Sequence, residues 1–100
     1  MKIFFTQLAK EKLKEIYLFY KRTASVSSAK SIKKKILSDI KKLSKNPRIG
    51  NEEDALKYLK LSYRKLISGN YKIIYRIIEN QIIIDTIFDS RQEPEKLKKI

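Results

Sequence analysis

The chain has 100 residues, of which 42% are hydrophobic and 35% are charged, so it can form one small domain with a single modest core. Its 24 Lys and Arg exceed its 11 Asp and Glu, and the net charge of +13 favours anionic partners such as nucleic acid, the ribosome or an acidic protein. Because the sequence contains neither Cys nor His, it excludes disulfides and the usual zinc ligands, and we expect no metal and no cofactor.

The N-terminal quarter is expected to form a short strand followed by a helix. The apolar run at residues 2–5 fits a strand and is too short for a signal peptide, and no segment reaches the ~20 apolar residues of a membrane span, so we expect a cytoplasmic protein. Thr6 is a suitable N-cap for a helix over about residues 6–22. The apolar face of this helix, which we interpret as a packing face, consists of Ala9, Leu13, Ile16, Tyr17 and Tyr20.

A second helix is expected after an interruption at residues 25–28, where serines prefer turns and caps. It should end near Lys45, because Asn46-Pro47 disfavours helical geometry. Its apolar stripe comprises Ala29, Ile32, Ile36, Ile40 and Leu43. The short connection predicts that the two helices pack antiparallel, and residues 51–61 are expected to form a loop with a short turn of helix.

The second half of the chain predicts three strands in succession, over residues 63–67, 71–78 and 82–88. Ser68-Gly69-Asn70 is typical of a hairpin turn between the first two. The central strand alternates between two faces, one with Tyr71, Ile73, Tyr75 and Ile77, and the other with Lys72, Ile74, Arg76 and Ile78. Helices should cover one face and leave the other partly basic.

Together these elements predict one α+β domain over residues 1–100. Its order is β-α-α-β-β-β, with an antiparallel two-helix hairpin packed on an antiparallel sheet and the N-terminal strand at an edge. A short C-terminal helix is expected to begin at Pro94.

Three stretches of the chain carry a resemblance to a known family. The helix hairpin and its exit from Ile16 to Gly50, the strand pair from Tyr63 to Ile77, and the end of the last strand from Phe88 to Pro94 follow one another at the family's order and spacing. In these stretches the sequence resembles the RelE/ParE superfamily of toxins from type II toxin–antitoxin systems. The resemblance covers nearly the whole chain, and its ParE-like branch is favoured.

ParE-like toxins poison DNA gyrase, which requires a binding surface and no catalytic residue in the toxin. The long helix hairpin and the few candidate catalytic groups favour this function, with a target-contacting basic patch formed by Arg64, Lys72, Arg76 and Arg91. The resemblance also implies a cognate antitoxin that forms a hetero-oligomer with the toxin. An acidic, partly disordered antitoxin segment that wraps the hairpin and the sheet would suit the charge of +13.

Two alternatives stay open, so the sequence does not decide whether the chain is an enzyme. A RelE-like toxin would cut messenger RNA on the ribosome, with Arg64 or Lys65, Lys72 and Arg91 stabilising phosphate charge, although a solvated charged face explains these residues equally well. The chain lacks His and any Tyr after Tyr75, and its late acids, interpreted as surface or capping residues, are Asp85, Asp89, Glu93 and Glu95. The other alternative is a non-catalytic basic module that binds nucleic acid with strong salt dependence.

Overall fold

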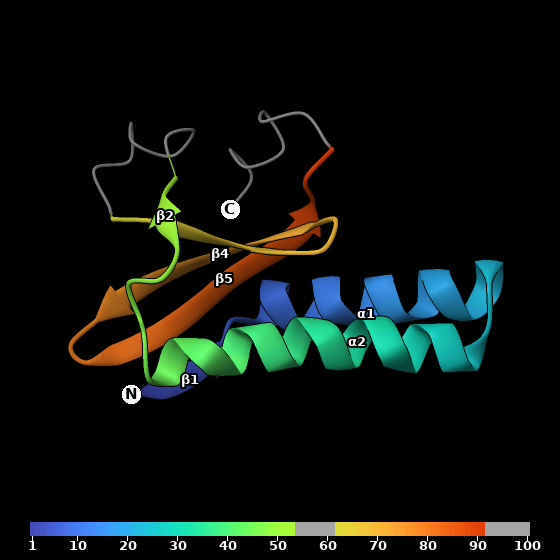
Figure 1. Cartoon of the computed structure of the whole chain (residues 1–100), viewed down its shortest axis with the longest axis horizontal. Coiled ribbons are helices and arrows are strands. Elements are labelled where there is room, and N and C mark those ends of the chain that lie inside the picture. Colours follow the sequence, from blue (N-terminus) through green and yellow to red (C-terminus); the bar gives the residue numbers. More distant parts are fainter. Residues whose placement is uncertain (54–61, 92–100) are drawn as a thin grey trace.

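The computed structural model describes residues 1–53 and 62–91, which form a helix hairpin packed on a sheet (Figure 1). The elements are β1 (Lys2–Phe5), α1 (Gln7–Thr23), α2 (Val26–Lys41), the 3-10 helix η1 (Lys42–Ser44), β2 (Asn51–Glu52), β3 (Arg64–Ser68), β4 (Tyr71–Ile78) and β5 (Gln81–Asp89). No helix in these two ranges is long and apolar enough to cross a membrane. The predicted α+β architecture with a two-helix hairpin is confirmed.

Both long helices begin at side-chain caps. The Thr6 hydroxyl accepts a hydrogen bond from the Ala9 amide at 3.0 Å, as the sequence predicts. The Ser25 hydroxyl does the same for the Ser28 amide at 3.0 Å, so α2 begins at Val26, earlier than expected, and the serines lie in its first turn. Only Ala24 and Ser25 separate the helices, and so short a turn leaves them antiparallel and side by side (Figure 1).

The sheet is mixed, so the prediction of an antiparallel sheet was wrong for one pair of strands. The strand order is β1-β5-β4-β3-β2, and β1 lies parallel to β5, whereas the other neighbours are antiparallel. No tight turn joins β1 to β5, so nothing local imposes an antiparallel arrangement. The position of β1 at an edge is confirmed.

Residues 51–61 were expected to form a loop with a turn of helix, but Asn51 and Glu52 instead pair with β3 as the short edge strand β2. The rest of that turn, at residues 54–61, lies outside the described residues. The predicted C-terminal helix from Pro94 lies outside them as well.

The core forms between the hairpin and one face of the sheet. Tyr71, Ile73 and Tyr75 of β4 are buried there against Ile36 and Ile40 of α2, which confirms the predicted alternation. The opposite face, which we call the outer face, carries a smaller cluster made of Tyr63, Ile74 and Phe88.

A β-bulge in β5 changes which of its residues face the core. Ile74 pairs with Thr86 and Tyr75 pairs with Ile84, so Asp85 has no partner across the ladder. The extra residue shifts the alternation by one. Ile82, Ile84 and Ile87 therefore all reach the core, and Asp85 points to the outer face.

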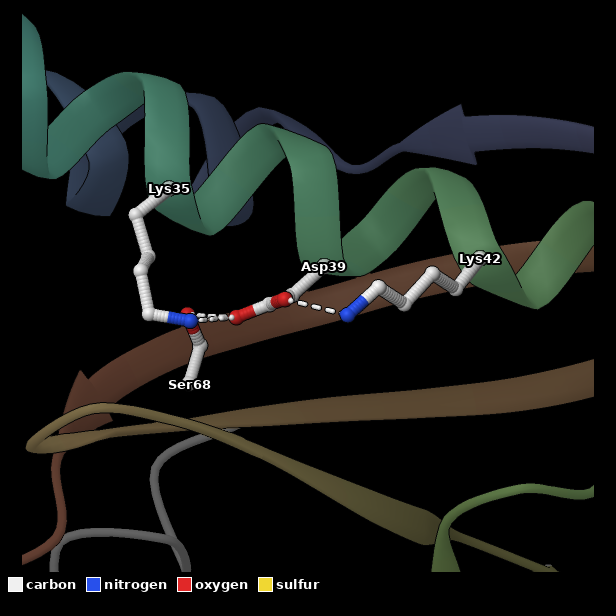
Figure 2. A network of polar contacts seen from close by, with 4 residues as sticks. All are labelled: Lys35, Asp39, Lys42 and Ser68. Atoms are coloured by element: carbon white, nitrogen blue, oxygen red, sulfur yellow. Dashed lines mark hydrogen bonds and ion pairs between the residues drawn. The ribbon is translucent and has the colours of Figure 1, made fainter.

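A buried carboxylate connects α2 to the strand β3 (Figure 2). Asp39 accepts hydrogen bonds from the Ser68 hydroxyl at 2.6 Å, from Lys35 at 2.8 Å and from Lys42 at 3.1 Å. Burial by itself raises the pKa of Asp39, but the hydrogen bonds from Lys35, Ser68 and Lys42 outweigh it and lower the pKa to about 2. The ionised carboxylate therefore stabilises the contact between the two layers.

Candidate functional site

The strand register divides the predicted basic residues between the two faces of the sheet. Lys65 pairs with Ile74, so it shares the outer face with Lys72 and Arg76. Arg64 pairs with Tyr75, and its side chain therefore lies on the face that packs against the helices. The predicted target-contacting residues do not form one continuous patch.

Arg64 holds the segment that leads from the hairpin into the sheet. Its Nε donates to the Gly50 carbonyl at 3.0 Å and its Nη2 to the Arg48 carbonyl at 3.4 Å. The Tyr75 hydroxyl donates to the Pro47 carbonyl at 2.8 Å and accepts from the Gly50 amide at 3.0 Å. These contacts give Arg64 a structural role in anchoring this segment.

On the outer face, Lys65 and Lys72 converge on the buried carboxylate of Glu53. Their ammonium nitrogens lie 3.5 and 3.6 Å from its Oε2, and the Glu53 side chain is 4% exposed. At these distances the attraction is electrostatic, and Oε2 accepts no hydrogen bond from the described residues. Glu53 is not among the predicted site residues, because a loop was expected at this position, although the acidic run at residues 52–54 in a basic chain was a usable signal.

Arg76 forms a bidentate ion pair with Asp85, with both N–O distances at 2.8 Å. This hydrogen bonding raises the pKa of Arg76. Asp85 was interpreted as a surface or capping acid, which was wrong, because its side chain is 4% exposed. The β-bulge turns it toward Arg76. The Arg76 guanidinium also lies over the Tyr63 ring, 5.3 Å from its centroid, and Lys72 lies 5.5 Å from the centroid of Phe88.

Arg91 lies away from this cluster, just beyond the end of β5. It pairs with Asp89 and lines a groove between α1 and the sheet together with Tyr20 and Tyr71. Hydrogen bonds from the Arg91 side chain and backbone lower the pKa of Asp89 to about 2. Among the described residues no contact joins Arg91 to Lys65 or Lys72, so the three candidate nuclease residues are not brought together as one group.

The net positive charge is concentrated on the helices. Residues 51–53 and 62–91, which contain β2 to β5, have five Lys and Arg and five Asp and Glu, and are therefore neutral. Residues 7–44, which contain α1, α2 and η1, have eleven Lys and Arg against three Asp and Glu, a net charge of +8. Within the described part of the chain, no three His, Cys, Asp or Glu side chains gather to hold a metal ion.

The chain matches one known protein family and is similar in fold to several solved structures. Residues 3–94 match the family described as the ParE toxin of the type II toxin–antitoxin system parDE. A chain of the chromosomal ParDE system from P. aeruginosa superposes with a TM-score of 0.73 at 19% identity, over 89% of this chain and 95% of that one. A comparison with curated protein sequences returned no match.

Two further toxin–antitoxin complexes share the fold at lower similarity. A chain of the intact E. coli RelBE complex has a TM-score of 0.53 at 17% identity, covering 91% of this chain and 98% of its own length. A chain of the YoeB–YefM complex from Staphylococcus aureus has a TM-score of 0.55 at 21% identity, with coverages of 86% and 92%. At these identities the structural likeness concerns the fold alone.

Proposed function

Because this chain belongs to the ParE toxin family of type II toxin–antitoxin systems, we propose that it stops growth by poisoning DNA gyrase until a cognate antitoxin binds it. The proposal extends the family assignment to a molecular target. It requires a surface that binds gyrase, and it requires no catalytic group in the toxin.

The pairing of charges on the outer face supports binding over RNA cleavage. Cleavage needs cations that are free to stabilise charge developing on a phosphate, and groups that remove and supply a proton. Lys65 and Lys72 are instead opposed by Glu53, and Arg76 is opposed by Asp85. This internal neutralisation is the observation that carries the proposal.

Among the predicted target-contacting residues, Arg91 is the best placed to reach gyrase. Its side chain is 72% exposed, whereas those of Lys72 and Arg76 are 20% and 25% exposed. Arg64 contributes only by holding the segment at Gly50. Arg91→Ala should therefore lower toxicity in the folded protein more than Lys72→Ala does.

The test is pulse-labelling of cells just after the toxin alone is induced. Gyrase poisoning predicts that thymidine incorporation fails before leucine incorporation, and that purified gyrase accumulates cleaved DNA when the wild-type chain is added. If neither incorporation falls, the chain acts as a binding module without this toxicity, and the proposal is wrong.

One observation favours RNA cleavage as a second candidate. The ammonium groups of Lys65 and Lys72 both lie within 3.6 Å of Glu53 Oε2, so two cations that can stabilise charge on a phosphate are close together on the outer face. This candidate predicts that leucine incorporation fails first and that the double variant Lys65→Ala, Lys72→Ala abolishes toxicity while the protein stays folded.

A further inference from the structure

An exposed stripe of side chains follows the side of α1 that faces away from the core. Four exposed residues recur along it at intervals of four, three and four, and so lie on one face of the helix: Glu11, Glu15, Leu18 and Arg22. Ala9 and Ile16, which are buried, lie on the opposite face of α1. Neither α2 nor the sheet therefore covers these four residues, which we call the α1 stripe.

The middle of the α1 stripe is apolar, although it faces solvent. Leu18 is 44% exposed, and Phe19 beside it is 47% exposed. The Phe19 ring packs edge-on against Tyr20, with 5.3 Å between the ring centroids, and this contact steadies it. A hollow of about 530 Å³ between α1 and the end of the sheet opens next to Leu18 and Phe19. The stripe therefore offers an apolar centre with space beside it for the side chains of a partner.

The charges of the α1 stripe are balanced, unlike those of the rest of the hairpin. Glu11 and Glu15 are two of the three acids in residues 7–44, and both lie on the stripe. Glu15 is 3.5 Å from the ammonium of Lys12, but both side chains are exposed, so this pair is weak. Arg22 has no carboxylate within 4.0 Å on residues 1–53 or 62–91, and its guanidinium lies 5.9 Å from the centroid of the Phe19 ring. Arg22 is therefore available to an acid of another molecule.

The two signs of charge are arranged symmetrically about the apolar centre. Glu15 and Arg22 are seven residues apart, which is two turns of helix or about 10 Å, and Leu18 lies between them. When two copies of α1 pack antiparallel about a two-fold axis at Leu18 and Phe19, Glu15 of each copy lies opposite Arg22 of the other. The apolar side chains then meet at the axis between two identical ion pairs. The stripe is thus complementary to itself.

We propose that two copies of this chain form a homodimer through the α1 stripe. Charge complementarity favours a second copy over the anionic partners that suit the rest of the hairpin. Glu11 and Glu15 would repel a phosphate backbone or an acidic protein segment. A second copy brings Arg22 to each Glu15 and covers Leu18 and Phe19 with the same apolar surface.

The total charge of the chain opposes this contact but does not prevent it. Two copies with a net charge of +13 repel each other, yet at physiological salt charges more than about 8 Å apart are largely screened. Contacts within the stripe therefore decide whether the copies associate. One pair of helices buries less than the roughly 800 Å² per partner of a standard interface, so the dimer should be weak.

The experiment measures self-association of the purified full-length chain by analytical ultracentrifugation, from about 1 to 500 µM in about 0.15 M salt. The variants are Glu15→Arg, Arg22→Glu and the double variant that exchanges the two charges. Lys21→Glu is the matched control, because it changes the net charge as much as Arg22→Glu does, at an exposed position off the stripe. Circular dichroism checks that every variant is folded.

We expect Glu15→Arg and Arg22→Glu each to weaken the dimer about 10-fold, because each change places like charges opposite one another twice in the symmetric contact. The double variant should return to within about threefold of the wild type, since both ion pairs form again with their signs exchanged. Lys21→Glu should not weaken the dimer. Leu18→Ala should weaken it about 10-fold and leave the protein folded, because Leu18 is largely exposed.

A disulfide provides a second measurement of the same contact. The chain has no Cys, so Leu18→Cys introduces a single thiol, which the two-fold axis places next to its counterpart in the second copy. Under mild oxidation Leu18→Cys should form a covalent dimer about 10-fold faster than Lys21→Cys, whose thiol is exposed but lies off the stripe.

Several results would overturn the proposal. A chain that stays monomeric at every concentration, with equal oxidation rates for the two Cys variants, has no such contact. A dimer that Glu15→Arg leaves unchanged uses another surface, and a double variant that is not restored does not pair Glu15 with Arg22. Lower toxicity of Leu18→Ala in cells, without any dimer of the wild type, would mean that the stripe contacts a different protein.

Discussion

The helix hairpin and the outer face of the sheet both carry cations, but carboxylates neutralise those of the outer face far more completely than those of the hairpin. Lys65, Lys72 and Arg76 each lie against a buried carboxylate from a neighbouring segment. Six exposed hairpin lysines have no such partner among the described residues, namely Lys10, Lys14, Lys30, Lys33, Lys34 and Lys41. A count of basic residues therefore overestimates the charge that the sheet offers to a partner and locates the available charge on the helices.

The difference follows from how the two elements place their side chains. The outer face of the sheet receives side chains from several strands, so Asp85 of β5 and Glu53 beside β2 come close to cations of β3 and β4. The exposed face of a helix meets only its own turns and one neighbouring helix. With three acids in residues 7–44, most of the hairpin lysines have no carboxylate partner among the described residues.

The largest expected effect comes from placing a charge in the core that the two regions share. Ile36 and Ile73 are 1% and 0% exposed, so Ile36→Asp or Ile73→Asp should cost several kcal/mol, on the order of the total stability of a small domain. Circular dichroism should show an unfolded chain. Ile67→Asp is the control, because Ile67 is 54% exposed and its variant should fold. A folded, toxic Ile73→Asp protein would contradict the core assignment.

The next largest effect is the loss of stability when a paired cation is removed, compared with the loss when an unpaired cation is removed. Arg76→Ala should destabilise the protein by about 3 kcal/mol, because it leaves the 4% exposed Asp85 without its partner. Lys34→Ala on the exposed face of α2 should change stability by no more than about 0.5 kcal/mol. Urea denaturation of both variants measures the difference. Equal values would mean that the sheet cations are no more structural than the hairpin lysines.

A third prediction concerns Gly50, in the segment that connects the two regions. A Cβ there would lie 2.3 Å from the Lys65 carbonyl oxygen and 2.7 Å from the Tyr75 hydroxyl, so Gly50→Ala should cost about 2.5 kcal/mol. Gly69 has a φ of +58° but open space around it, and Gly69→Ala should cost only about 1 kcal/mol. Thermal unfolding compares the two. If Gly50→Ala costs no more stability than Gly69→Ala, the segment at Gly50 moves easily and does not hold β2 in place.

The smallest effect is the pH dependence of the contact between α2 and β3. Because the pKa of Asp39 falls from 3.8 to about 2 on folding, its contribution of about 2 kcal/mol is present above about pH 4 and is lost as pH falls toward 2. Asp39→Asn should lower the free energy of unfolding at neutral pH. It should also make that free energy fall less steeply as the pH is lowered from about 4 to 2. Denaturation between pH 2 and 6 tests this, with Asp89→Asn as the control on the second low-pKa carboxyl. If the stability of Asp39→Asn falls between pH 4 and 2 as steeply as that of the wild type, Asp39 does not have this role.

Local patterns in the sequence were enough to predict most of the elements. Apolar spacing of 3.6 residues located α1 and α2, and alternation over residues 71–78 matched β4 and its two faces. Each of these signals lies within one element, where side-chain direction depends on backbone geometry alone. The resemblance to the RelE/ParE superfamily, confirmed by the family match, rests on the order of the same elements.

Predictions that depended on contacts between distant segments were less successful. The target patch of Arg64, Lys72, Arg76 and Arg91 combined residues that the strand register places on opposite faces or away from each other. Glu53 was missed because its position beside Lys65 and Lys72 depends on how the edge of the sheet is completed.

The sequence by itself determined the helices, the meander, the family and the total charge, because propensity, periodicity and composition are properties of the chain. The tertiary structure decided that β1 lies parallel to β5, that a bulge turns Asp85 toward Arg76, and that charge remains available mainly on the hairpin. These outcomes depend on strand register and on which acid reaches which cation. Both are settled only when segments remote in the chain pack together.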